Sequence, residues 1–188
     1  MSKVCWIDYI EPLEAEGRLK EVYERVLRER GRVANVFKAH SLNPDAMDAH
    51  LTLYMRLMFG NSPLSRADRE LIATVASACN KCLYCMTHHG EVLQKYLRSG
   101  EVVKEIIEKM SSAPVDERRR ALIGFVQKLT LLPSAVSEDD VKNLKKHGYS
   151  DREILDTVLI TAYFNFVNRI VLGLGVKLEA GEERTYKS

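Results

Sequence analysis

The chain has 188 residues, of which 46% are hydrophobic and 29% are charged. This length is sufficient for one well-buried core and short for two independent domains, so residues 1–188 are expected to form a single domain. A formal net charge of +2 argues against a nucleic-acid or anionic-membrane partner. The only dense basic run, Arg118-Arg119-Arg120, opens an amphipathic segment and is expected to be a solvated helix face.

Apolar residues recur with helical spacing along most of the chain, and strand-like alternation is nearly absent. After an extended N-terminal arm, helices are predicted over about residues 19–31, 36–37, 43–58, 65–79, 83–99, 103–110, 116–131, 137–146 and 150–174. Ser65, Ser137 and Ser150 are each followed three residues later by an acidic residue, which is typical of helix starts. The sequence therefore predicts an all-α protein, a compact multi-helix bundle.

The apolar stretch from Ile154 to Val176 is long enough to raise the question of a membrane span. It is interrupted by Asp156, Asn165, Asn168 and Arg169, and burying these polar groups in lipid is costly. We expect a core helix packed on several sides, whose polar groups have partners or face a cavity, and no membrane partner. The polar tail from Glu179 to Ser188 is expected to be loose.

The N-terminus, Met1 to Trp6, has no apolar run of the length of a signal peptide. We therefore predict a cytoplasmic location. In a reducing compartment, paired cysteines indicate metal or redox chemistry more often than structural disulfides.

Residues 70–89 contain three of the four cysteines and two of the five histidines. Cys82, Cys85 and His89 are spaced i, i+3 and i+7, so they share one helix face, and the two thiols are one turn apart. If the helices on either side of Asn80-Lys81 fold back on each other, Glu70 lies level with His89. A carboxylate, an imidazole and a dithiol then converge.

These groups suit thiol redox chemistry. A free cysteine has a pKa of about 8.5, and a helix N-terminus or a nearby base favours its thiolate. His89 can take a proton from Cys85, and Glu70 can orient the imidazole. The thiolate can attack a peroxide to give a sulfenic acid, and the second thiol condenses with it to a disulfide. An external dithiol reduces that disulfide, so no bound cofactor is required.

The arrangement Glu-(eleven residues)-Cys-x-x-Cys-(three residues)-His resembles the signature of the alkyl hydroperoxidase D/carboxymuconolactone decarboxylase family. Asn80 to Cys85 followed by His88-His89 resembles its peroxidase-related branch, most strongly over about residues 44–110. The resemblance implies an AhpD-like helical bundle that assembles as a homo-oligomer, from dimer to hexamer. It implies a peroxidase for hydrogen or alkyl hydroperoxides, with a reductant such as dihydrolipoamide or a thioredoxin-like protein.

By the same resemblance, Cys85 is the peroxidatic thiol, Cys82 the resolving thiol and proton donor, and Glu70 with His89 the proton relay. The best-known members have a histidine immediately before the second cysteine, where this chain has Tyr84. Tyr84 can donate a hydrogen bond, and we keep it and His88 as secondary candidates. Members that decarboxylate muconolactones generally lack the cysteine pair, which argues against that activity here.

Three alternatives stay open at this point. Cys79 extends the motif to Cys-x-x-Cys-x-x-Cys, with His88 at a ligand-like distance, so a structural zinc or iron–sulfur site is a competing hypothesis. The pair can also serve a thiol–disulfide oxidoreductase without peroxidase activity, or be incidental in a helical scaffold. His40 and His50 have no partner pattern and are assigned no role.

Overall fold

The structure, a computed structural model, describes residues 3–180. Within that range nine α-helices and three 3-10 helices occur, and no β-strand. The α-helices are α1 (Gly17–Arg30), α2 (Asn35–Lys38), α3 (Pro44–Phe59), α4 (Arg66–Cys79), α5 (Leu83–Leu97), α6 (Gly100–Lys109), α7 (Glu117–Leu131), α8 (Glu138–Lys146) and α9 (Asp151–Leu174). The 3-10 helices are Pro12–Glu14, Met110–Ser112 and Pro133–Ala135. The predicted all-α fold is confirmed.

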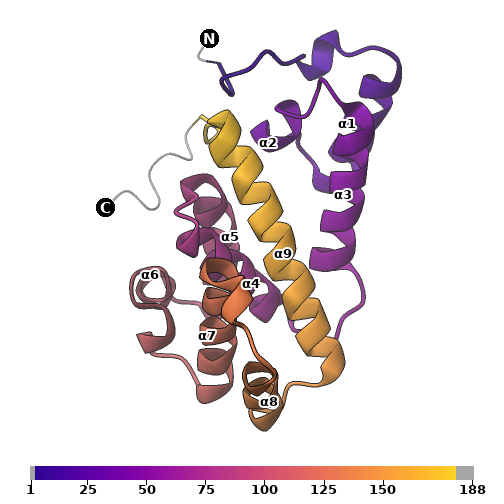
Figure 1. Ribbon diagram of the computed structural model, residues 1–188. Helices are drawn as coiled ribbons and strands as arrows, with labels where there is room; N and C mark the ends of the chain where they lie inside the picture. Colours follow the sequence, from indigo (N-terminus) through magenta and orange to yellow (C-terminus); the bar gives the residue numbers. More distant parts are fainter. Residues whose placement is uncertain (1–2, 181–188) are drawn as a thin grey trace.

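Helix α9 runs through the middle of the protein (Figure 1). Helices α1 to α3 lie on one side of it, and α4, α5 and α7 lie on the other. Helix α4 packs against α5, α7 and α9, while α6 packs on α5 and α8 on α7. The buried side chains of these helices form one hydrophobic cluster. Helices α4 and α9 therefore lie at the centre of the fold, and most of the other helices pack against one or both of them.

The serines expected to start helices do so. The Ser65 hydroxyl accepts from the backbone N–H of Asp68 at 3.1 Å, and Ser137 and Ser150 open capping boxes. The end of α5 differs from the prediction, because Arg98 takes the left-handed conformation (φ 55°) and Ser99 caps α6. Gly100 is therefore the first residue of α6.

Helix α9 is long and apolar enough to cross a membrane by length and composition, and 44% of its most apolar window is buried inside the protein. Asn168 on its inner face is completely buried. Leu155, Leu159 and Phe166 on its outer face are 41–52% exposed. As expected of a core helix, α9 packs against several elements, namely α3, α4, α7 and α8, but no described segment covers the face that carries Leu155, Leu159 and Phe166.

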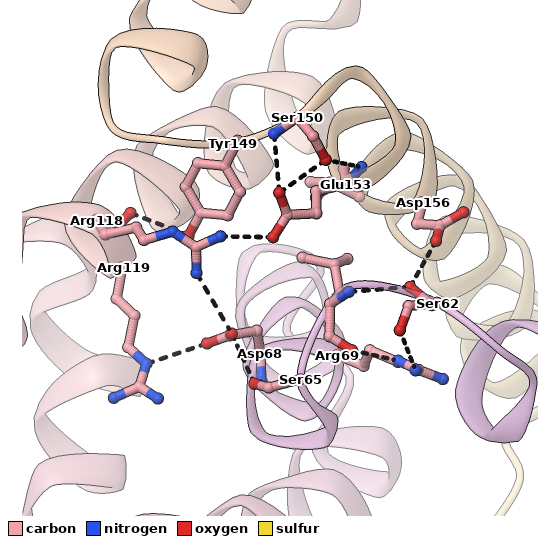
Figure 2. Close-up of polar contacts among 12 residues, drawn as sticks. Ser62, Ser65, Asp68, Arg69, Arg118, Arg119, Tyr149, Ser150, Glu153 and Asp156 are labelled. Carbon is pink, nitrogen blue, oxygen red and sulfur yellow. Dashed lines mark hydrogen bonds and ion pairs between the residues drawn. The ribbon is translucent and has the colours of Figure 1, made fainter.

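Charged side chains hold the starts of α4, α7 and α9 together (Figure 2). Asp68 of α4, whose side chain is 6% exposed, pairs with Arg119 at 3.0 Å and with Arg118 at 3.9 Å, both on α7. Arg118 also pairs with Glu153 of α9 at 2.5 Å. The basic run was expected to be a solvated face, and two of its arginines instead neutralise largely buried carboxylates.

The N-terminal arm lies beside the end of α9. The Trp6 N–H donates to the Leu174 carbonyl at 2.8 Å, and the Lys177 N–H donates to the Val4 carbonyl at 2.9 Å. Gly175 between them has φ 59°, and a Cβ there would lie 2.1 Å from the Trp6 ring, so this position requires glycine. The chain is thereby led back over α5, which brings Glu179 to the site described next.

Candidate functional site

The hairpin of α4 and α5 carries all four expected site residues. Helix α4 ends at Cys79, and Asn80 with Lys81 forms the turn, in which Lys81 takes a left-handed φ of 54°. The backbone N–H of Cys82 donates to the Ser77 carbonyl at 2.9 Å and closes this turn. Cys82 is then the residue that precedes α5, outside the helical conformation (φ −87°, ψ 88°). The predicted interruption at Asn80-Lys81 is confirmed.

Glu70 and His89 meet across this hairpin. Glu70 Oε2 lies 2.6 Å from His89 Nδ1, and the carboxylate is completely buried. Its other oxygen accepts from Arg66 Nη2 at 2.5 Å, so the acid has a cation or donor on each side. With Nδ1 bound to a carboxylate, Nδ1 is the protonated nitrogen. The Nε2 atom has no hydrogen-bond partner among residues 3–180, which leaves it to exchange protons with a ligand.

The two thiols are free, buried and hydrogen-bonded to each other. The hydrogen bond from the Cys85 thiol, helped by the Cys85 backbone N–H, lowers the pKa of Cys82 in spite of its burial. The same hydrogen bond and burial raise the pKa of Cys85 well above its usual range. The first proton to leave the pair therefore comes from Cys82, at the start of α5, where backbone amides favour a thiolate.

Asn168 of α9 completes the surroundings of the dithiol. Its amide hydrogen-bonds both sulfurs and lowers the pKa of each, and it also donates to the Ser77 hydroxyl at 3.2 Å. Its oxygen accepts from the Asn80 amide at 3.0 Å. The sequence indicated only that a buried Asn168 needs partners, because nothing in its spacing connects α9 to a hairpin some eighty residues earlier.

A pocket of about 180 Å³ opens onto this centre. Glu70, His89 and Cys85 line it, together with the secondary candidates Tyr84 and His88. Cys82 is completely buried and does not line the pocket. Of the two thiols, only Cys85 is thus placed to meet a ligand.

Tyr84 and His88 are tied to the C-terminal segment. The Tyr84 hydroxyl donates to Glu179 Oε1 at 2.8 Å, and His88 Nε2 lies 3.0 Å from Glu179 Oε2. The backbone N–H of Asn35 donates to the same carboxylate at 2.8 Å. Burial raises the pKa of Glu179, but the hydrogen bonds from His88 and Asn35 outweigh it and lower that pKa. Glu179 was expected in a loose tail and is instead a fixed part of the site, while residues 181–188 lie outside the described residues.

His40 and His50 have no role predicted from the sequence, and the structure joins them to the pocket. His40 Nδ1 lies 2.7 Å from the Val36 carbonyl, so it is the protonated nitrogen, and Nε2 accepts from His50 Nδ1 at 3.3 Å. His50 Nε2 then accepts from the Tyr163 hydroxyl at 2.6 Å. Burial lowers the pKa of His50 to about 3, which keeps it neutral. The chain of hydrogen bonds fixes the Tyr163 hydroxyl as a donor to His50.

Cys79 does not join the pair. It is half-buried at the end of α4, and burial raises its pKa to about 11. Within residues 3–180 no three His, Cys, Asp or Glu side chains are grouped so as to hold a metal ion. The described part of the chain therefore offers no ligand set for the zinc or iron–sulfur alternative.

Comparison with known proteins places this geometry in context. Residues 7–188 match the family described as PA26 p53-induced protein (sestrin). The chain is 24% identical to mouse (Mus musculus) sestrin-3 over 152 residues, 79% of this chain and 30% of that protein. It is 24% identical to mouse sestrin-2 over 172 residues, 90% of this chain and 35% of that protein. The chain thus spans about a third of the length of these curated relatives.

Solved structures resemble this one over almost the whole chain. A peroxidase-related protein from Silicibacter sp. TM1040 has a TM-score of 0.86 and 29% identity, covering 98% of this chain and 97% of its own. A peroxidase-related protein with the alkylhydroperoxidase AhpD core, from Ralstonia eutropha JMP134, has a TM-score of 0.87 and 27% identity, covering 97% and 96%. The predicted AhpD-like fold is confirmed. The debrominase Bmp8 has the same fold, with a TM-score of 0.78 and 20% identity over 97% and 95%, so the fold supports more than one activity.

Proposed function

Because the chain belongs to the sestrin (PA26) family and shares its fold with AhpD-like peroxidase-related proteins, we propose that it is a thiol-dependent peroxidase. It reduces hydrogen peroxide or alkyl hydroperoxides through a dithiol–disulfide cycle of Cys82 and Cys85. One observation carries the proposal: a hydrogen-bonded thiol pair whose outer sulfur lines the same pocket as the Glu70–His89 pair.

Attack begins with a shift of charge within the thiol pair. The singly deprotonated pair holds its charge on Cys82, to which the Cys85 thiol donates. Transfer of that proton to Cys82 leaves the thiolate on Cys85, the sulfur that faces the pocket. Cys82 thus acts as the base for Cys85 and keeps the proton for the later step.

The Cys85 thiolate then attacks the terminal oxygen of the hydroperoxide. A sulfur–oxygen bond forms, the O–O bond breaks, and its electron pair leaves with the alkoxide. Protonated His89 donates the Nε2 proton to that alkoxide, which gives an alcohol, and buried Glu70 stabilises the imidazolium beforehand. Cys85 is left as a sulfenic acid.

The resolving step joins the two sulfurs. Cys82 attacks the sulfenic sulfur, a disulfide forms, and hydroxide leaves with the Cys82 proton as water. An external dithiol, such as dihydrolipoamide or a thioredoxin-like protein, reduces the disulfide through a mixed disulfide and restores both thiols. The reductant supplies both electrons, so the cycle needs no bound cofactor.

Mass spectrometry of the four cysteines after one equivalent of peroxide tests the proposal. We expect one disulfide between Cys82 and Cys85, a dimedone-trapped sulfenic acid on Cys85 in Cys82→Ser, and no reaction in Cys85→Ser. Cys79→Ser is the matched control and should react like the wild type. A sulfenic acid on Cys82 at the wild-type rate in Cys85→Ser would reverse the assignment of the two thiols. A disulfide formed by oxidised lipoamide but not by peroxide would favour the thiol–disulfide oxidoreductase.

Assembly as a homo-oligomer, dimer to hexamer, is part of the proposal. The exposed Leu155, Leu159 and Phe166 follow one another along α9 with the spacing of a helix-pairing face. Light scattering should give a dimer or larger species for the wild type and a smaller one for Leu159→Glu, and a wild-type monomer would contradict it. A cytoplasmic location stays a prediction.

A further inference from the structure

The pocket is larger and more apolar than hydrogen peroxide requires. Its volume of about 180 Å³ has room for about six water molecules at about 30 Å³ each. Away from the reacting groups its wall is largely aromatic and aliphatic, and it includes Phe37, Tyr54, Tyr163, Phe164 and Val167. Such a wall favours a ligand with an apolar body.

Three arginines line this pocket: Arg30, Arg32 and Arg66. Arg30, in the last turn of α1, lines the pocket and is half-buried. Its guanidinium carbon lies 5.0 Å from the ring centroid of Tyr54 and 4.6 Å from that of Phe59. These ring contacts hold the side chain at the pocket, and within residues 3–180 its N–H donors make no hydrogen bond, so they are available to a ligand.

The charge of Arg30 is not neutralised by any carboxylate among residues 3–180. Other arginines nearby are paired: Arg25 with Glu29 at 2.8 Å, and Arg66 with Glu70 at 2.5 Å. Arg30 therefore contributes an uncompensated positive charge at the pocket. A planar guanidinium with several free donors is suited to bind a carboxylate through two hydrogen bonds.

The candidate anion site and the reacting groups both lie near the Tyr54 ring. The Tyr54 ring is 5.0 Å from the Arg30 guanidinium and 6.4 Å from the His89 imidazole. A ligand lying against Tyr54 reaches both. We propose that the pocket takes organic hydroperoxides that carry a carboxylate, with the acid group on Arg30 and the O–O bond at Cys85. This proposal rests on the proposed function and names the substrate class of that site.

The reaction of such a substrate is the one already given. The Cys85 thiolate takes the terminal oxygen and becomes a sulfenic acid, and the alkoxide receives the His89 proton. The product is the corresponding hydroxy acid, and the carboxylate is unchanged. The anion on Arg30 thus contributes binding and orientation and takes no part in the electron transfer.

Two peroxides with the same apolar body test this substrate class: cumene hydroperoxide and its para-carboxylate. With wild-type protein and excess dithiothreitol, we expect a KM about tenfold lower for the carboxylate. In Arg30→Gln the ratio of the two KM values should fall to about one, whereas the matched control Arg28→Gln, on the exposed side of the same turn, should keep the wild-type ratio. Equal KM values for the two peroxides in the wild type, or an unchanged ratio in Arg30→Gln, would overturn the proposal.

A binding measurement separates this proposal from the peroxidase reaction itself. By calorimetry, 4-isopropylbenzoate, which has no peroxide group, should bind the reduced wild type, and the neutral 4-isopropylbenzamide should bind about tenfold more weakly. Arg30→Gln should lose that difference. If peroxide is not reduced but the benzoate still prefers Arg30, the peroxidase proposal fails and the anion site stands. If peroxide is reduced and the benzoate shows no preference, the anion site fails alone.

Discussion

Acid should destabilise this protein through His50, and the effect can be calculated. Burial, with the neighbouring His40, lowers the pKa of His50 to about 3, against 6.5 for an unperturbed histidine. The unfolded chain therefore binds a proton between pH 6.5 and 3 that the folded chain does not. The stabilisation is complete above about pH 6.5 and is lost as the pH falls. Between pH 7 and pH 5 this one group should remove about 2 kcal/mol from the free energy of unfolding.

The comparison of His50→Gln with the wild type isolates this contribution. Glutamine can accept from Tyr163 and donate to His40, but it does not titrate. Urea unfolding of the reduced proteins, followed by far-UV circular dichroism, should show a loss from pH 7 to pH 5 that is about 2 kcal/mol smaller in His50→Gln. His147→Gln, away from the pocket, should behave like the wild type. Equal losses in His50→Gln and the wild type would refute the neutral, buried state of His50.

Three further substitutions test other parts of the structure. Glu70→Gln removes the carboxylate that stabilises the protonated His89, so stopped-flow oxidation by peroxide should slow about a hundredfold, and an unchanged rate would exclude the relay. Asn168→Leu removes an amide that lowers the pKa of both thiols, so the ultraviolet thiolate absorbance should titrate at a higher pH than in the wild type; a titration at the wild-type pH would contradict this role. Asp68→Asn removes the carboxylate that Arg118 and Arg119 share, and urea unfolding should show a loss of about 1–2 kcal/mol, whereas wild-type stability would show that these two pairs contribute nothing.

The part of the site that the sequence predicted is the part that is local in sequence. Glu70 and His89 lie almost equally far from the turn at Asn80-Lys81, so the periodicity of two helices was enough to bring them together. The thiols were placed on one edge by their spacing of one turn. Helix starts were predictable for the same reason, because a capping serine hydrogen-bonds the backbone N–H only three residues later.

The rest of the site depends on tertiary packing, which periodicity does not determine. Asn168 reaches the thiols only because α9 packs on α4. His50 and Arg30 enter the pocket because α3 packs on α9 and α1 packs on α3, and neither residue has a partner at a characteristic spacing. Glu179 was expected to be solvated, and the return of the chain past Gly175 instead puts it against Tyr84.

This division of the site between one hairpin and several distant helices has an evolutionary consequence. The groups that exchange electrons and protons occupy twenty consecutive positions, 70–89, while most of the surface that selects a ligand belongs to α1, α2, α3 and α9. Mutations in those helices can change which ligands bind and leave the positions of the two thiols unchanged. A lineage built on this scaffold can therefore acquire new substrates by small steps, and the debrominase that shares the fold is in keeping with such a history.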